Sequence, residues 1–164
     1  MKRIVVYQSK TGFTKQYAEW IAEELNCTAI DIKHVKMTQI QENDQVIFGG
    51  WIMGGMISGL NKIRKMNPKN LVVYAVGSTP EDIVDQEKIK GQNALQETPF
   101  FYMVGGFQFN KLNFLIRGML NTMKKSTAKK ENKNAEETFM VEHLGTNFDN
   151  SDKKYTQELV RFLA

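Results

Sequence analysis

The sequence predicts an α/β fold in which a parallel sheet is covered by helices on both faces. Short runs of β-branched and aromatic residues alternate along the chain with segments whose apolar residues recur at helical spacing. These runs are too short and too continuously apolar for amphipathic helices, as expected for parallel strands buried on both faces. The five predicted strands are residues 3–7, 28–32, 45–48, 71–76 and 100–104.

Apolar residues at helical spacing predict a first helix after the first strand and a last helix near the end of the chain. The first stripe consists of Tyr17, Ala18, Ile21, Ala22 and Leu25, and the last of Tyr155, Leu159, Phe162 and Leu163. Both helices are predicted to pack on the sheet. The stretch 126–137 is almost wholly polar and has no periodic apolar face, so it is interpreted as a mobile solvated loop.

Length and composition favour a single globular domain, residues 1–164. This length allows one domain with a sizeable core but not two ordinary ones. A hydrophobic share of 41% and a charged share of 24% are close to soluble averages, which argues against disorder. No apolar run approaches the roughly 20 residues of a membrane-spanning helix, and the first residues look like a strand rather than a signal peptide. We therefore expect a cytoplasmic protein.

The sequence contains no candidate metal site. Cys27 has no partner for an intramolecular disulfide, and Cys27, His34 and His143 lack the spacing of a ligand set. Cys27 is therefore interpreted as a packing residue.

The most informative segment joins the first strand to the first helix and reads VVYQSKTGFT over residues 5–14. A helix N-terminus exposes unpaired N–H groups and a partial positive charge, so it favours an anion. Ser9, Thr11 and Thr14 add hydroxyl donors, and Gly12 lets the backbone approach a ligand closely. Each hydrogen bond to a charged group contributes roughly 1.5–3 kcal/mol, so several can hold a phosphate without an arginine.

Two other nucleotide-binding motifs are excluded. The segment lacks the Gly-Lys-Ser/Thr ending of a P-loop and the three spaced glycines of a dinucleotide-binding turn. The alternative interpretation is a helix N-cap rich in Ser and Thr that binds no ligand.

This segment, with Ala18 beyond it, resembles the signature of the flavodoxins, which bind flavin mononucleotide (FMN). The resemblance implies a flavodoxin-like three-layer sandwich with strand order 2-1-3-4-5 and a ligand at the carboxyl ends of the strands. It also implies that the FMN phosphate is held by Ser9, Lys10, Thr11, Gly12, Phe13 and Thr14.

Residues 49–55, GGWIMGG, match in position the flavodoxin loop that contacts the isoalloxazine ring of FMN. The resemblance implies that Trp51 stacks on the ring; the alternative is that Trp51 is a partly buried anchor on a turn. The residues expected to contact the ring here are Gly50, Trp51, Ile52, Met53 and Gly54.

A second ring-binding loop is expected after the fourth strand, at residues 77–82, with contacts from Gly77, Ser78, Thr79 and Pro80. It contains no Tyr, so the second aromatic wall of an ordinary flavodoxin is missing, and one ring face would be open to a planar substrate or a quinone. The net charge of +4 also differs from the strongly acidic flavodoxins, and we expect a flavin that is easier to reduce.

A second departure from ordinary flavodoxins is a long insertion at about residues 105–137, after the fifth strand. It contains a Gly- and Phe-rich segment, an apolar helix and several lysines. In placement and character it resembles the insertion of the menaquinone-dependent protoporphyrinogen IX dehydrogenase branch of the flavodoxin superfamily. No catalytic side chain follows from that resemblance, because the redox chemistry is the flavin's own.

The features above favour an FMN-dependent oxidoreductase that passes electrons from an organic donor, such as a porphyrinogen, to a quinone-type acceptor. One alternative is an electron carrier between redox proteins, and another is a flavodoxin-like scaffold without flavin. We expect a small-molecule or quinone redox partner and no nucleic-acid partner.

The helix of the insertion also predicts a contact with a membrane surface. Its apolar stripe consists of Leu112, Leu115, Ile116, Met119, Leu120 and Met123, and Lys111, Arg117, Lys124 and Lys125 lie outside that stripe. This pattern is typical of a helix that lies on a bilayer, so residues 107–125 are expected to touch the inner face of the membrane peripherally. The alternative is that the stripe is buried on the protein's own sheet.

Overall fold

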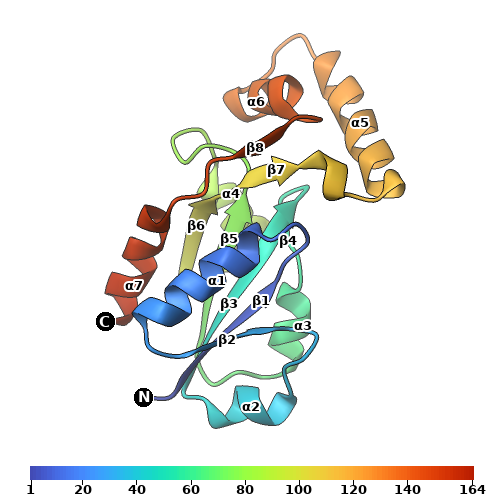
Figure 1. Ribbon diagram of the computed structural model, residues 1–164. Coiled ribbons are helices and arrows are strands. Elements are labelled where there is room, and N and C mark those ends of the chain that lie inside the picture. Colours follow the sequence, from blue (N-terminus) through green and yellow to red (C-terminus); the bar gives the residue numbers. More distant parts are fainter.

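Five parallel strands form the central sheet of the computed structural model, which describes residues 1–164 (Figure 1). They are β1 (Arg3–Gln8), β2 (Thr28–Asp31), β3 (Gln45–Met53), β5 (Leu71–Gly77) and β6 (Phe100–Val104). Their order in the sheet is β2-β1-β3-β5-β6, with every neighbouring pair parallel. If only these five parallel strands are numbered along the chain, the order is 2-1-3-4-5, so the predicted fold class is confirmed.

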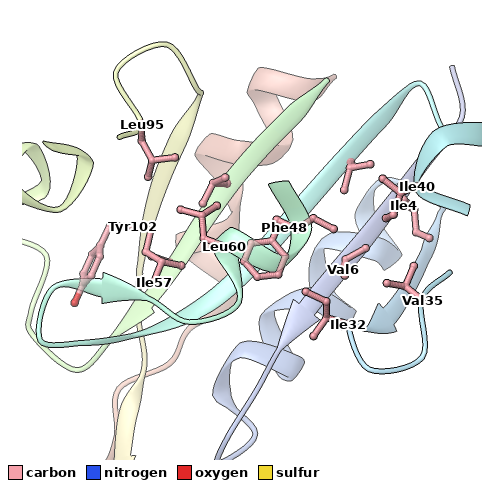
Figure 2. Packing of buried hydrophobic residues seen from close by; sticks show 14 of the residues in the cluster. Ile4, Val6, Ile32, Val35, Ile40, Phe48, Ile57, Leu60, Leu95 and Tyr102 are labelled. Atoms are coloured by element: carbon pink, nitrogen blue, oxygen red, sulfur yellow. The ribbon is translucent and has the colours of Figure 1, made fainter. Parts of the chain in front are cut away.

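Helices cover both faces of the sheet because side chains alternate between the faces along each strand. On β1, Val5 packs against α1 (Phe13–Glu24) and α7 (Gln157–Leu163), while Ile4 and Val6 point to the opposite face. That opposite face is covered by α2 (Met37–Glu42), α3 (Leu60–Lys65) and α4 (Gln86–Gln92). Figure 2 shows the second of these two cores, in which Phe48 lies between residues of the sheet and of α3.

The predicted stripe of α1 is buried, with Leu25 half-buried just beyond the helix end. In α7, Leu159 and Leu163 are buried, but Phe162 is 54% exposed, and its ring lies tilted against that of Phe101 at 5.6 Å between ring centroids. The prediction was therefore wrong for Phe162, because a helix of this length at the sheet margin has room to bury only one side.

Strand β3 runs on to Met53, so the prediction that it ends at residue 48 and that residues 49–55 form a loop was wrong. Gly50 and Trp51 pair with Ala75 and Val76 of β5, which keeps the backbone extended. β3 then turns back into the short antiparallel strand β4 (Met56–Ile57). Gly54 and Gly55 form the turn with φ angles of 58° and 80°, the positive values that a two-residue hairpin needs.

A separate layer, which we call the insertion (residues 106–149), lies above the carboxyl ends of the sheet strands (Figure 1). It contains β7 (Gly106–Gln108), the short 3₁₀ turn η1 (Phe109–Lys111), α5 (Phe114–Ala128), α6 (Ala135–His143) and β8 (Asn147–Asp149). β7 and β8 pair antiparallel, with Phe107 opposite Phe148. The chain then returns to the main body through the 3₁₀ turn η2 (Lys153–Thr156), which carries Tyr155.

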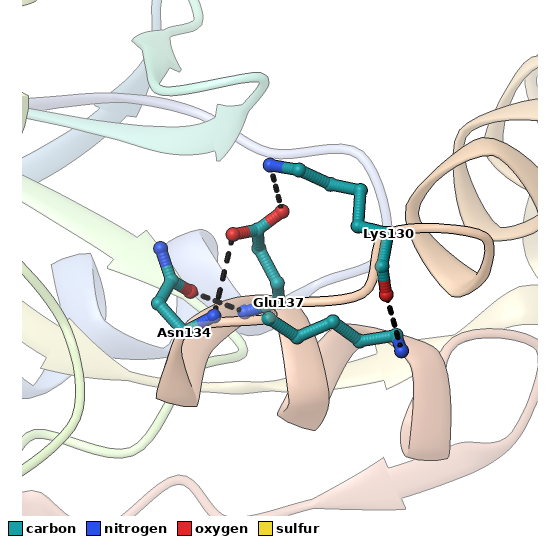
Figure 3. A network of polar contacts seen from close by, with 4 residues as sticks. Lys130, Asn134 and Glu137 are labelled. Atoms are coloured by element: carbon teal, nitrogen blue, oxygen red, sulfur yellow. Dashed lines mark hydrogen bonds and ion pairs between the residues drawn. The ribbon is translucent and has the colours of Figure 1, made fainter.

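The interpretation of residues 126–137 as a mobile loop was wrong, because α5 continues to Ala128 and α6 begins at Ala135. Helix α6 has no apolar stripe, and its N-terminus is stabilised by local polar contacts instead (Figure 3). The side-chain oxygen of Asn134 accepts from the Glu137 N–H at 2.8 Å, and the Glu137 carboxylate accepts from the Asn134 N–H at 3.4 Å. Lys130 forms an ion pair with the same carboxylate at 2.6 Å. This reciprocal cap satisfies the donors at the helix start.

The predicted apolar stripe of α5 is divided between two environments. Leu112 and Leu120 are buried with Leu144, and Ile116 and Met123 pack against them. Leu115 and Met119 instead face solvent, so the prediction of one continuous stripe was wrong. The reason is that α5 packs on α6 and the β7–β8 pair rather than on the sheet, and such a thin layer covers only one side of a helix.

Candidate functional site

The segment that joins β1 to α1, Ser9 to Thr14, forms a tight turn that we call the phosphate loop. Gly12 has a φ of 104°, a backbone conformation that side-chain-bearing residues rarely adopt. Its N–H donates to the Ser9 hydroxyl at 3.1 Å, which closes the turn. Ser9 and Gly12 of the predicted motif therefore shape the loop itself.

The first turn of α1 leaves backbone N–H groups without acceptors. The helix has no side-chain cap, and the Gln16 N–H donates to the Gly12 carbonyl at 3.0 Å. The N–H groups of Phe13, Thr14 and Lys15 have no acceptor within the protein. Such groups form an anion-binding site at a helix start. The Tyr74 hydroxyl donates to the Thr14 carbonyl at 3.2 Å and thereby ties this turn to the sheet.

The β3–β4 hairpin, which carries the predicted ring contacts, is held in place by one buried side chain. Asn93, at the end of α4, is 4% exposed. Its oxygen accepts from the Ile57 N–H at 2.9 Å, and its nitrogen donates to the Gly55 carbonyl at 2.8 Å. Sequence reasoning missed Asn93, because nothing in the local pattern of α4 distinguishes it from a surface asparagine.

The second predicted ring loop, after β5, is anchored by Tyr102 of β6. The Tyr102 hydroxyl donates to the Thr79 carbonyl at 2.7 Å. Burial raises the pKa of Tyr102 above its ordinary value, so the hydroxyl keeps its proton and remains a donor. A side chain at Gly77 would come within 2.5 Å of that hydroxyl, which explains the glycine. Sequence reasoning placed Tyr102 in a strand and assigned it no role at the site.

These three segments open into one cavity of about 340 Å³ at the carboxyl end of the sheet. Twelve of the fifteen predicted site residues line it: Ser9, Lys10, Thr11, Phe13, Thr14, Trp51, Ile52, Met53, Gly54, Gly77, Ser78 and Thr79. Gly12, Gly50 and Pro80 do not. Gly12 shapes the phosphate loop from outside, a side chain at Gly50 would meet the Ser58 carbonyl at 2.3 Å, and Pro80 lines a separate hollow near Tyr155.

The cavity continues into the insertion, whose apolar side chains form its far wall. This wall was not predicted to be part of the site. It consists of Phe107, Leu112, Ile116, Leu120, Met123, Phe139, Met140, His143, Leu144 and Phe148. Several of these rings are in contact: Phe139 stacks on His143 at 4.1 Å between ring centroids, and both meet Phe148 edge to face. One end of the cavity is therefore polar, and the other is apolar and aromatic.

One charged group at the border of the cavity connects the insertion to the main body. The carboxylate of Glu136, on α6, accepts a hydrogen bond from the backbone N–H of Asp85, at the start of α4. A hydrogen bond from the Lys130 ammonium and, to a smaller extent, one from the Asn134 N–H lower the pKa of the neighbouring Glu137 carboxyl. Lys10 and Lys88 also line the cavity and add positive charge on the side of the main body.

No group of three or more His, Cys, Asp or Glu side chains is arranged to hold a metal ion. Burial raises the pKa of the Cys27 thiol, which reduces its reactivity.

The residues of the cavity fit FMN. The unpaired N–H groups and hydroxyls of the phosphate loop match a phosphate dianion, and Trp51 offers an aromatic face for a flat ring. The cavity volume lies within the range of about 300–1,000 Å³ that is usual for cofactor sites. Bound FMN would supply the redox chemistry, while these residues would hold the phosphate, orient the ring and exclude water.

Trp51→Ala is expected to increase the fluorescence of bound FMN several-fold, because Trp51 lines the cavity and a stacked indole quenches the flavin. The measurement is the steady-state flavin emission at saturating protein. Trp20→Ala is the matched control, since Trp20 lies on α1, edge-on to Tyr17, and does not line the cavity. An unchanged yield in Trp51→Ala would mean that the tryptophan is only a structural anchor.

The chain was compared with known proteins. Similar solved structures include an archaeal flavodoxin, which is 19% identical over 63% of this chain and 83% of its own, with a TM-score of 0.46. Another is Flavodoxin 2 from Bacillus cereus, which is 17% identical over 63% of this chain and 86% of its own, with a TM-score of 0.43. A third is a WrbA-like flavodoxin from Agrobacterium tumefaciens, which is 19% identical over 62% of this chain and 83% of its own, with a TM-score of 0.44. A search of curated protein sequences found no match. The flavodoxin domain family matches residues 4–134. The chain therefore belongs to the flavodoxin domain family, and FMN is its cofactor.

Proposed function

We propose that the chain is an FMN-dependent oxidoreductase that takes electrons from an organic donor of the porphyrinogen type and passes them to a quinone-type acceptor. The observation that supports this proposal is the continuity of the cavity. The phosphate loop and the apolar wall of the insertion line the same space, so a second, apolar molecule has a place next to the flavin ring.

The chemistry of the two ends of the cavity suits these reactants. A quinone that becomes a quinol gains two electrons and two protons, and a porphyrinogen that becomes a porphyrin loses six of each, so it reduces three quinones in successive two-electron steps. A quinone is flat, a porphyrinogen consists of flat pyrrole rings joined by saturated carbons, and such apolar rings favour walls of aromatic and aliphatic side chains. Phe107, Phe139 and Phe148 supply the aromatic part of this wall, and Ile116 and Met123 supply the aliphatic part.

An electron carrier between proteins is the alternative function. Such a carrier needs a ring edge that a partner protein can approach, and it has no use for an apolar pocket beside that ring. In this chain the insertion covers the carboxyl ends of the strands, and Glu136 fastens it to the main body. The net charge of +4 also differs from the acidic surface expected of a small shuttle protein.

The acceptor half of the proposal is tested by reducing the FMN-loaded protein and mixing it with menadione in a stopped-flow instrument. We expect the reoxidation rate to saturate with menadione concentration, because the quinone binds before it reacts. Ile116→Trp, which fills the apolar end of the cavity, should lower the apparent second-order rate constant about tenfold or more. Ferricyanide, which needs no apolar site, should reoxidise this variant at the wild-type rate.

Leu115→Trp is the matched control, because Leu115 lies on the same helix but is 70% exposed and does not line the cavity. A menadione rate that is linear in concentration and equal in all three proteins would contradict a quinone site. The donor half is tested anaerobically with a porphyrinogen and menadione, by following porphyrin fluorescence. If porphyrin forms no faster than with free FMN, while a flavodoxin reductase reduces the protein rapidly, the carrier function is favoured.

A further inference from the structure

Three apolar side chains of α5 point away from the protein. Phe114, Leu115 and Met119 are 74%, 70% and 45% exposed, and they are among the most exposed large apolar residues of the chain. At 100° per residue, their side chains span about 140° of the helix circumference, next to the side that packs on α6. Single exposed apolar residues are ordinary, but three on one helical face form a patch that indicates an interaction site.

We infer that Phe114, Leu115 and Met119, which we call the outer patch, dock the insertion on an anionic lipid bilayer. The charges around the patch select this partner. Residues 109–130 contain six basic residues and no acidic one. Of these, Lys125 lies at the edge of the outer patch, and Arg117 lies between it and the buried side of the helix. Apolar residues flanked by basic ones are the pattern by which a helix lies in the headgroup region of anionic lipids.

The charges also argue against the most obvious other partner, a second copy of the chain. In a symmetric dimer the outer patches of two copies would face each other, and each would bring Arg117 and Lys125 close to the same groups on its partner. No acidic residue in the stretch 109–130 is available to compensate them. An anionic bilayer provides both the apolar layer and the opposite charge.

The size of α5 fits a helix that lies flat on the surface. With 15 residues, it is about 22 Å long, which is shorter than the hydrocarbon core of about 30 Å. None of the helices is long and apolar enough to cross a membrane. The adjacent side of the same helix, at Ile116, Leu120 and Met123, lines the cavity. A single helix therefore separates the cavity from the proposed bilayer, so a lipid-soluble ligand would have a short way between them.

The test is co-sedimentation of the FMN-loaded protein with vesicles of phosphatidylcholine alone or mixed with phosphatidylglycerol, at low and high salt. We expect wild type to pellet only with the anionic vesicles and to be released by salt. Leu115→Ser/Met119→Ser removes apolar surface and should lower the partition coefficient at least about tenfold. Arg117→Glu/Lys125→Glu should lower it about 30-fold or more, because each basic residue at such a surface contributes about fivefold. Lys124 is left unchanged, since its ammonium donates to the Leu144 carbonyl at 2.9 Å and supports the fold.

Two control variants carry the same kinds of change at other places. Met37→Ser alters an apolar residue that is 49% exposed on α2, at the opposite end of the molecule (Figure 1). Lys62→Glu/Lys65→Glu changes the net charge as much as the insertion variant does, but on α3. Both should pellet as wild type does.

The inference is overturned if wild type stays in the supernatant with every vesicle, or if the patch variants and the controls pellet equally. A concentration-dependent dimer in sedimentation velocity that is lost in Leu115→Ser/Met119→Ser, without vesicle binding, would assign the patch to a second copy instead. Vesicle binding is measured without any quinone or donor, so its failure leaves the proposed oxidoreductase function standing, and failure of the menadione assay leaves the docking standing.

Discussion

FMN is expected to bind at least about a thousandfold more tightly than riboflavin, which lacks the phosphate. Three N–H groups at the start of α1 have no acceptor in the protein, and the phosphate is the part of FMN that can accept from them. Hydrogen bonds to a charged group contribute roughly 1.5–3 kcal/mol each, so even two or three of them account for a factor of this size. The measurement is a fluorescence titration with each flavin.

Thr14→Val should weaken FMN binding by about 1–3 kcal/mol, because it keeps the shape of a side chain that is 1% exposed and removes one donor from the cavity wall. Riboflavin binding should not change. Thr156→Val is the matched control: Thr156 is also 1% exposed at a helix start, but it does not line the cavity. Equal affinities of wild type for the two flavins would show that the loop is only a polar helix cap.

Gly49→Ala is expected to lower the free energy of unfolding by about 3 kcal/mol, near the upper end of the usual cost of overpacking. An added Cβ would lie 1.9 Å from the ring of Tyr74. That ring has no space to move, because Tyr74 is fully buried and its hydroxyl donates a hydrogen bond to the Thr14 carbonyl. The measurement is urea unfolding of the protein without FMN, which keeps cofactor binding out of the result.

Gly91→Ala is the control for that substitution. Gly91 lies in α4, and an added Cβ there meets nothing within 4 Å. Since alanine favours a helix more than glycine does, the control should be as stable as wild type or more stable by up to about 1 kcal/mol. If Gly49→Ala unfolds at the wild-type urea concentration, the close contact between β3 and Tyr74 does not restrict this position.

The parts of the fold that could be predicted from the sequence are those whose signal is local. Five short runs rich in apolar residues are enough to identify the five parallel strands, and the hydroxyl-rich turn before α1 is a local motif whose chemistry is visible residue by residue. The course of β3 beyond residue 48 was not visible, because it depends on pairing with Val76 in another strand. Helix α6 was not visible either, because the cap formed by Asn134 and Glu137 starts it rather than an apolar stripe.

The candidate site divides in the same way. Its polar end was predicted, since Ser9 to Thr14 are consecutive in sequence. The anchors of the two ring loops, Asn93 and Tyr102, act on backbone groups far along the chain, so only the three-dimensional structure identifies them. The apolar wall was not predicted because one side of α5 faces a cavity and the other faces solvent, and periodicity alone cannot distinguish those environments.

The way the insertion leaves and rejoins the main body has a consequence for how such a protein can diversify. Gly106 and Asp149, its two ends, are paired in the β7–β8 ladder, and the Asn150 N–H donates to the Gly105 carbonyl at 3.1 Å just beyond it. The chain between them therefore forms a long loop whose two ends are held together, and a change in its length changes the entropy of loop closure only slightly. Residues in this loop can be exchanged without altering the register of any strand of the central sheet. Under the proposed function, the loop that binds the cofactor and the wall that contacts the substrate therefore belong to two segments that can evolve independently.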